Sequence, residues 1–377
     1  MQTETLGDPR PVSLPEIVNH MTLRPHSSPP ELILGNANRR FSGVTSTMLQ
    51  VLAAQRNQIS TLVLGEYHLP QEIEAYQFLA LARRLRQADV ESTVVVFHAR
   101  RNIEIIQALL LKQVAKCQIK ILFTSTAQRH HTAFTRWLMT QVDSVISTCS
   151  AAASYLKPPP ETLIPHGIDA DRYRPDASDS LSDLIHLSGA EYHIGLFGRV
   201  RPQKGVDILV KASIPLLQAN PNWEVVFIGQ IKTTDQSFVD QLKTLAAKAG
   251  VEAQIRFLGE QPFNALPSLF NAMTIVTALS RNEGYGLTVL EAMSSGKPVV
   301  ASRAGAWPDI IEHDHNGCLV DVEDIEATRS ALERLIQNPN TRERLGNAAR
   351  QHVLARYTIQ SEAEALLSHY RRLAARH

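Results

Sequence analysis

The chain has 377 residues, of which 44% are hydrophobic and 20% charged, a composition typical of a globular protein long enough for two domains. No apolar run approaches the ~18 residues that span a bilayer, and the first residues show no secretory signal. The net charge of +1 points to no nucleic-acid partner. The three cysteines, Cys117, Cys149 and Cys318, are far apart, which disfavours a disulfide framework or a cysteine metal site and favours a cytoplasmic protein.

The charges are distributed unevenly along the chain. Residues 31–165 contain fourteen Lys or Arg and nine Asp or Glu, a balance of +5, whereas residues 166–377 contain twenty-two and twenty-five. A basic first half favours an anionic acceptor or contact with a membrane surface. An uneven solvated surface with no special role is the alternative.

The first part of the chain predicts an arm followed by one domain. Residues 1–30 contain six prolines and little apolar periodicity, which predicts a flexible arm. From there, short apolar runs alternate with helical patterns, and this alternation predicts a parallel sheet covered by helices over residues 31–170. The predicted strands are 32–35, 60–65, 93–98, 120–125 and 144–148, and the predicted helices are 44–56, 72–86, 102–115 and 131–142.

A segment rich in Pro and Asp, 157–180, interrupts this pattern, and we place a linker at 171–190. The alternation then resumes and predicts a second doubly wound domain over 191–355, followed by a helical tail at 356–377. Its predicted strands are "HIGLFGR", "WEVVFIG", "QIRFLG", "MTIVTA", "KPVVAS" and "NGCLV".

Residues just after strands are the first candidates for a site, because open parallel sheets bind ligands beyond the carboxyl ends of their strands. Arg199 follows the strand "HIGLFG", and Lys204 precedes the next helix. Two cations at this place suit a pyrophosphate, which Arg grips with a planar fork and Lys meets as a point charge. Two solvated cations in a turn are the alternative.

The stretch "NEGYGLTVLEAM" (282–293) places two glutamates around a glycine-rich turn and the start of a helix. Gly284 and Gly286 let the backbone approach a ligand, and the free amides at Leu287 and Thr288 attract anions. Glu291 is placed to accept the hydroxyls of a ribose, and Glu283 those of a transferred sugar. A metal site here would need more oxygen or nitrogen ligands.

Other polar residues follow strands of the first half. His98 is either a functional residue or a core histidine. Arg100 and Arg101 open a helix where its dipole disfavours cations, which suggests an anionic acceptor. The loop that follows the strand 120–125 contains further acceptor-side candidates, namely Arg129, His130 and His131.

Two motifs that look like metal sites have plainer interpretations. "DAD" (169–171) lies where the halves join, and we assign it a hinge role. "EHDHNG" (312–317) is typical of a turn.

Several segments resemble a known family. "IPHGIDADRYRP", "GRVRPQKG" and "NEGYGLTVLEAMSSGKPVVAS" resemble signature segments of the family 4 retaining glycosyltransferases. "SGVTSTMLQ", "FHARRNIE" and "TSTAQRHHTAFTRWLM" resemble the N-terminal domain of bacterial lipopolysaccharide-core mannosyltransferases of that family. The resemblance covers roughly residues 31–375. It implies the GT-B fold, in which two Rossmann-like domains face each other across a cleft and the final helix crosses back onto the N-terminal domain.

The resemblance also implies roles for the candidate residues. Arg199 and Lys204 would bind the donor diphosphate, Glu283 the donor sugar and Glu291 the ribose. Backbone amides would come from Gly284, Tyr285, Gly286, Leu287 and Thr288. Gly43 would let the loop after the first strand pass close to donor and acceptor. His98 would contact the donor sugar near the reacting carbon.

The implied reaction is retaining transfer of a hexose, mannose from GDP-mannose, to a saccharide or glycolipid acceptor in lipopolysaccharide core synthesis. It would need no metal or other cofactor, and the basic first half would contact the inner face of the cytoplasmic membrane. A sugar-nucleotide epimerase or hydrolase on the same scaffold, and a non-catalytic nucleotide-sugar-binding protein, are the alternatives. A dehydrogenase is disfavoured, because no G-x-G-x-x-G follows an early strand.

Overall fold

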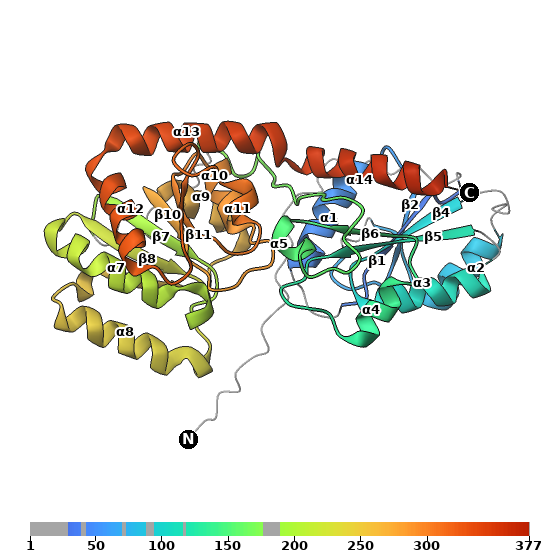
Figure 1. The fold of residues 1–377 in the computed structure, drawn as a ribbon, viewed down its shortest axis with the longest axis horizontal. Helices are drawn as coiled ribbons and strands as arrows, with labels where there is room; N and C mark the ends of the chain where they lie inside the picture. The colour runs from blue at the N-terminus through green and yellow to red at the C-terminus, as the bar shows by residue number, and fades with distance from the viewer. Residues whose placement is uncertain are drawn as a thin grey trace, which may run out of the picture.

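The computed structural model describes residues 29–38, 43–69, 73–87, 94–115, 118–175 and 189–376. Nearly all of the predicted arm, Cys117 and most of the predicted linker lie outside these residues. The described chain forms two six-stranded parallel sheets, one in each half (Figure 1).

The first sheet has the strand order β3-β2-β1-β4-β5-β6, which is the Rossmann order. Its strands are β1 (Leu32–Gly35), β2 (Thr61–Leu64), β3 (Ala75–Tyr76), β4 (Val94–Ala99), β5 (Gln118–Ser125) and β6 (Ser144–Ser147). The helices of this half are α1 (Gly43–Gln55), α2 (Phe78–Gln87), α3 (Asn102–Val114), α4 (Ala133–Met139) and α5 (Ser150–Ala153).

The second sheet repeats this topology, with the order β12-β11-β10-β7-β8-β9. Its strands are β7 (Tyr192–Phe197), β8 (Trp223–Ile228), β9 (Ile255–Gly259), β10 (Ile275–Ala278), β11 (Val299–Ser302) and β12 (Cys318–Val320). Its helices are α7 (Val206–Ala219), α8 (Gln236–Lys248), α9 (Leu266–Ala272), α10 (Thr288–Ser294), α11 (Trp307–Ile310), α12 (Ile325–Gln337) and α13 (Pro339–Arg356), with a short 3-10 helix η2 (Pro202–Lys204) before α7.

The predicted strands are confirmed to within two residues at most of their ends, because buried parallel strands appear as short continuous apolar runs. One prediction was wrong in part. The segment 72–86 was predicted as one helix, but α2 begins only at Phe78, and Ala75–Tyr76 pair with Val63–Leu64 as an edge strand. Pairing with β2 therefore overrides the local helical pattern here.

The last helix, α14 (Ile359–Ala374), leaves the second half and lies on the first (Figure 1). Its buried residues Ala363, Leu366, Leu367, Tyr370 and Leu373 share a core with strands β1, β2 and β4 and with helix α1. One face of the first sheet is therefore covered by the end of the chain.

The chain passes between the halves twice, and the two passages are hydrogen-bonded to each other. The Ile168 amide donates to the carbonyl of Tyr357 (2.8 Å), and the Ile359 amide donates to the carbonyl of Ile168 (3.2 Å). A Cβ at Gly167 would lie 2.2 Å from the carbonyl oxygen of Thr358, so only glycine permits this approach. We call the paired segments 167–168 and 357–359 the crossover.

None of the helices within the described residues is both long enough and apolar enough to cross a membrane.

Candidate functional site

The candidate residues of the second half lie where its strand order reverses. β7 and β10 are neighbours, although two strands separate them in sequence. The loop after β7 carries Arg199 and η2, and the loop after β10 carries Glu283 and the glycine-rich turn. Reversal points of this kind are where open α/β sheets bind ligands.

Lys204 and Glu283 form an ion pair between the Lys204 Nζ and the Glu283 Oε2, and both side chains are mostly buried. The Glu283 carboxylate also accepts from the Ser280 hydroxyl and from the Gly284 amide, at 3.2 Å each. Gly205, just after Lys204, has φ +70°, and a Cβ there would lie 2.0 Å from the Leu279 carbonyl oxygen. The two loops are therefore packed directly against each other.

Arg199 is exposed, and within the described part of the chain it has no ion-pair partner. It follows Gly198, which has φ +124°. Arg201, two residues later, has a buried Nε without a hydrogen-bond partner in the same described residues. The loop after β7 thus presents cationic groups that the described chain does not neutralise.

Hydrogen bonds from two aromatic side chains hold the glycine-rich turn in place. Trp307 donates from Nε1 to the carbonyl of Gly286 (3.0 Å), and the hydroxyl of Tyr285 donates to the carbonyl of His166 (2.8 Å). Burial raises the pKa of Tyr285 well above its ordinary value, so the hydroxyl stays protonated. Tyr285, predicted as a donor contact, thus ties the turn to the segment before the crossover.

Glu291 lies in the first turn of α10, where Tyr173 donates to its Oε1 (3.0 Å). Removal from water raises the pKa of Glu291 to about 7, and the Tyr173 hydrogen bond and the charge of Arg172 only partly oppose this. Arg350 fixes the arrangement, because its Nη1 donates to the carbonyls of Tyr173 (2.7 Å) and Ser294 (2.6 Å).

On the first half, Gly43 is the first residue of α1 and not part of the preceding loop. His98 is buried, with Nδ1 2.7 Å from the Tyr370 hydroxyl and Nε2 2.7 Å from the Thr124 hydroxyl. Burial, with the charge of Arg100, keeps the pKa of His98 well below its ordinary value, so the ring is neutral. Both ring nitrogens are engaged by protein groups.

Arg100 and Arg101 precede α3, and the buried Glu104 in its first turn offsets their charge. The Glu104 carboxylate accepts from the Arg100 amide (2.7 Å) and from the Arg101 Nη1 (2.9 Å). The two arginines at the N-terminus of α3, which the helix dipole disfavours, are thus offset at least partly by the Glu104 carboxylate. Arg100 nevertheless keeps a buried Nη1 with no partner among the described residues.

The loop after β5 brings the two halves together. Arg129 and His130 are exposed, His130 packs edge-on against Tyr155 (5.2 Å between ring centroids), and His131 Nε2 lies 3.0 Å from the Ser125 hydroxyl. Beside them, the Gln128 Nε2 lies so near Gly284 that a Cβ there would be 2.7 Å away. The acceptor-side candidates therefore lie in a loop that touches the glycine-rich turn.

The two metal-like motifs have local structural roles. Asp169 Oδ1 accepts from the amides of Asp171 (3.2 Å) and Arg172 (3.0 Å), which closes a turn beside the crossover. His313 Nδ1 accepts from the Leu319 amide (3.0 Å), and Asp314 pairs with Arg334. Over the described ranges, no three His, Cys, Asp or Glu side chains gather as candidate metal ligands.

Four residues that shape this site were missed in the sequence: Tyr173, Arg281, Trp307 and Arg350. Tyr173 and Trp307 bond directly to candidate residues from distant segments, Arg350 fixes the carbonyl of Tyr173, and the amide of Arg281 bonds to the loop that carries Lys204. No local pattern marks such contacts. Tyr173 lies inside the quoted segment "IPHGIDADRYRP", and Arg281 directly precedes the quoted stretch 282–293.

Comparison with known proteins gives consistent results. The model of the family "Glycosyl transferases group 1" matches residues 186–352. The lipopolysaccharide core biosynthesis mannosyltransferase LpcC of Rhizobium leguminosarum bv. viciae is 38% identical over 353 residues, which cover 91% of this chain and 96% of LpcC. The corresponding LpsB of Rhizobium meliloti (strain 1021) is 35% identical, covering 91% and 97%.

Among solved structures, Anabaena Alr3699/HepE in complex with UDP matches with a TM-score of 0.75 at 19% identity, covering 91% of this chain and all of that one. A glycosyltransferase from Rickettsia africae ESF-5 matches with a TM-score of 0.77 at 14% identity, covering 92% and 100%. Identities this low establish the fold alone, which is GT-B. The family model and the two relatives, matched over nearly their whole length, show that the chain belongs to the group 1 glycosyltransferases and is a glycosyltransferase.

Proposed function

We propose that this glycosyltransferase moves mannose from GDP-mannose to a saccharide or glycolipid acceptor of the lipopolysaccharide core, with retention of anomeric configuration. The mannose and the lipopolysaccharide core are supported by the names of the two relatives that match nearly the whole chain. Use of a nucleoside-diphosphate donor is carried by one observation: Lys204, Glu283 and the glycine-rich turn are packed together where the strand order of the second sheet reverses.

In the proposed mechanism, the leaving diphosphate gains negative charge as the sugar becomes oxocarbenium-like. Arg199, Lys204 and the amides of the glycine-rich turn stabilise that charge, an effect of roughly 3–4 kcal/mol for each well-placed donor. Glu283 positions the sugar by accepting its hydroxyls. A leaving phosphate oxygen takes the proton of the acceptor hydroxyl, so retention requires no protein nucleophile.

The ion pair between Lys204 and Glu283 gives this mechanism an exchange step. The diphosphate competes with Glu283 for the ammonium group of Lys204, and Glu283 is released toward the sugar as the donor binds. Donor binding and sugar positioning are then linked through one pair of side chains.

The test measures transfer and nucleotide affinity separately. Thermal-shift screening against GDP, UDP and ADP sugars identifies the base, and product analysis with and without acceptor separates transfer from hydrolysis or epimerisation. Glu283→Ala should lower turnover strongly with only a modest loss of nucleotide affinity, because Arg199 and Lys204 remain to bind the diphosphate. Arg199→Ala and Lys204→Ala should each lower both turnover and nucleotide affinity. Full turnover in Glu283→Ala would contradict the role of that residue, and donor consumption without acceptor would favour the alternatives.

We propose that the reaction needs no divalent ion, since protein cations and amides neutralise the diphosphate. Treatment with EDTA followed by removal of the chelator should leave kcat unchanged, and added Mg²⁺ should not raise it. A loss of activity that Mg²⁺ or Mn²⁺ restores would contradict this part of the proposal.

We also propose an anionic acceptor, bound near Arg100, Arg129 and His130. The support is the orphaned Nη1 of Arg100 and the exposed positions of Arg129 and His130 beside Gln128. Arg129→Ala should raise the acceptor KM while leaving the donor KM unchanged, and neutralising the anionic group of the acceptor should have the same effect.

We further propose that the protein contacts an anionic membrane surface through α4. Phe134 and Trp137 are 53% and 55% exposed and stack on each other, with the exposed Arg136 between them in sequence. The variant carrying Phe134→Ser and Trp137→Ser should lose co-sedimentation with phosphatidylglycerol vesicles. Leu354→Ser, at a leucine of α13 that is 47% exposed, serves as the control.

A further inference from the structure

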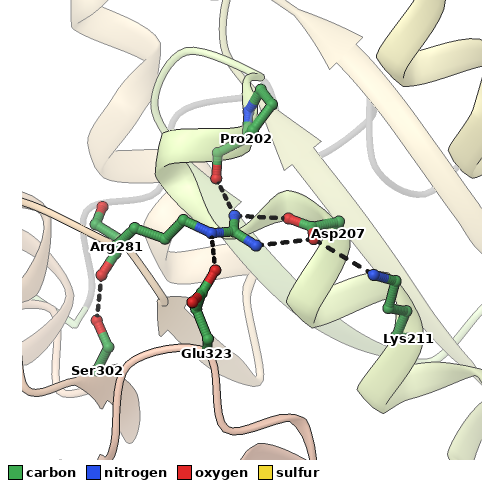
Figure 2. Close-up of polar contacts among 7 residues, drawn as sticks. Pro202, Asp207, Lys211, Arg281, Ser302 and Glu323 are labelled. Carbon is green, nitrogen blue, oxygen red and sulfur yellow. Dashed lines mark hydrogen bonds and ion pairs between the residues drawn. The ribbon is translucent and has the colours of Figure 1, made fainter.

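Arg281, three residues after β10, joins three separate segments of the second half (Figure 2). Its Nη1 and Nη2 bind the two oxygens of Asp207 at 2.9 and 3.0 Å, a bidentate pair with the first turn of α7. Nη1 also donates to the carbonyl of Pro202 in η2, and Nε pairs with Glu323 in the turn after β12.

Backbone and amide groups reinforce the same junction. The Arg281 amide donates to the carbonyl of Gln203 (2.8 Å), and the Gln203 side chain donates to the carbonyl of Asn282 (2.9 Å). The segment 202–204 is thus bound along its length to the segment 281–282. The residues next to these contacts are Lys204 and Glu283, the ion pair of the site.

The guanidinium itself is engaged by protein. Of its five N–H donors, four are directed at Asp207, Pro202 and Glu323. Burial of Asp207 would raise its pKa, but the hydrogen bond from Arg281 together with the charges of Arg281 and Lys211 holds the pKa below its ordinary value, so the carboxylate stays ionised. Arg281 is therefore occupied with holding loops and is not offered to a ligand.

We propose that Arg281 is a positioning residue for the donor: through its bidentate pair with Asp207 and its bond to Pro202, it holds the Lys204 loop in register with the Glu283 loop. This inference rests on the proposed function, in which those two loops meet the donor diphosphate and sugar. Bidentate geometry matters here, because a lysine supplies the charge without the fork that spans both Asp207 oxygens.

The experiment compares Arg281→Met and Arg281→Lys with a matched control, Arg303→Met. Arg303 follows β11 as Arg281 follows β10, but it is half-exposed and its ion pair is with the exposed Asp321. Nucleotide affinity is measured by calorimetry with GDP, UDP and ADP and with the corresponding monophosphates, at a temperature where every variant is folded. Steady-state kinetics give kcat and KM for donor and acceptor.

Arg281→Met is expected to lower kcat/KM for the donor by about 10- to 100-fold, the loss that misplacement by about 1 Å produces. It should weaken the diphosphate more than the monophosphate and leave the acceptor KM unchanged. Arg281→Lys should fall between wild type and Met, and Arg303→Met should match wild type.

The outcomes separate this inference from the proposed function. If Lys204→Ala weakens nucleoside-diphosphate binding but Arg281→Met lowers only the melting temperature, Arg281 is merely structural and the inference is wrong. If neither Lys204→Ala nor Arg199→Ala weakens any diphosphate, the proposed function itself is wrong. Should Arg281→Met not fold, Asp207→Asn removes the same bidentate pair from the other side and decides the question by the same measurements.

Discussion

Glu291 acquires its properties from residues far away in sequence. Tyr173 donates to its carboxylate, Arg172 adds a positive charge nearby, and removal from water raises its pKa to about 7. Its ionisation therefore changes near neutral pH. In the proposed function, the ionised form is the one that accepts the ribose hydroxyls.

The affinity for the donor nucleotide should therefore depend on pH. Below the pKa of Glu291 the carboxyl is protonated, and binding to the ionised form must release a proton, so affinity should rise as pH increases through about 7. Calorimetry in buffers of different ionisation enthalpy measures this release on either side of the pKa.

Two variants serve as controls for this prediction. Glu291→Gln should abolish the proton release, because an amide does not titrate. Tyr173→Phe should move the affinity profile to higher pH, because the hydrogen bond that it removes favours the ionised form of Glu291. An unchanged proton release in Glu291→Gln would assign the titration to another group.

At the level of single residues, the sequence predicts which side chains follow strands but not which of them meet. Lys204 and Glu283 are 79 positions apart, and their ion pair depends on β7 and β10 being neighbours. Arg281 looks like an ordinary loop cation in the sequence, since nothing local indicates that Asp207 and Glu323 converge on it. His98 has a recognisable position, yet its partner Tyr370 comes from the last helix.

Among the elements, the glycine-rich turn has two glycines with different physical requirements. Gly286 has φ +76°, and a Cβ there would lie 2.6 Å from Nε1 of the buried Trp307. At Gly284 a Cβ would meet only the end of the exposed Gln128 side chain, at 2.7 Å, and that side chain is free to move.

Gly286→Ala should therefore be much more harmful than Gly284→Ala. A left-handed conformation costs a non-glycine residue roughly 1–2 kcal/mol, and the clash with Trp307 must displace the turn as well. We expect Gly286→Ala to lower kcat/KM for the donor by about tenfold or more and Gly284→Ala by a smaller factor.

Steady-state kinetics check this order. The variant that combines Gly284→Ala with Gln128→Ser should recover most of the smaller loss, because the contacting atom is gone. Equal losses in the two alanine variants would show that backbone geometry at Gly286 is not the deciding factor.

Elements were predictable where burial alone decides them. Every strand of the described residues except β3 appears as an apolar run, because most of these parallel strands are buried. β3 has two residues and exists only through its pairing with β2, and the helical pattern of 72–86 hides it. Element ends that depend on a tertiary partner are beyond the reach of local periodicity.

For the whole molecule, Glu362 of α14 stabilises the crossover. Its carboxylate accepts from the Gly167 amide (2.8 Å) and lies 2.8 Å from the His166 Nδ1, and the side chain is buried. Glu362→Ala should lower the midpoint of thermal unfolding by several degrees, because each buried donor left without an acceptor costs roughly 1–3 kcal/mol.

Differential scanning fluorimetry compares this variant with Glu364→Ala, an exposed glutamate of the same helix that should leave the midpoint unchanged. An unaltered midpoint in Glu362→Ala would mean that these hydrogen bonds contribute little to holding the halves together.

The course of α14 has a consequence for anyone who exchanges parts between relatives of this enzyme. The N-terminal unit is not contiguous in sequence, because one face of its sheet is covered by the helix of residues 359–374, which follows the whole second half in the chain. A chimera with a single junction near residue 170 would pair one parent's sheet with the other parent's covering helix. Acceptor preference should transfer intact only when two junctions are used, so that the tail travels with the sheet it covers.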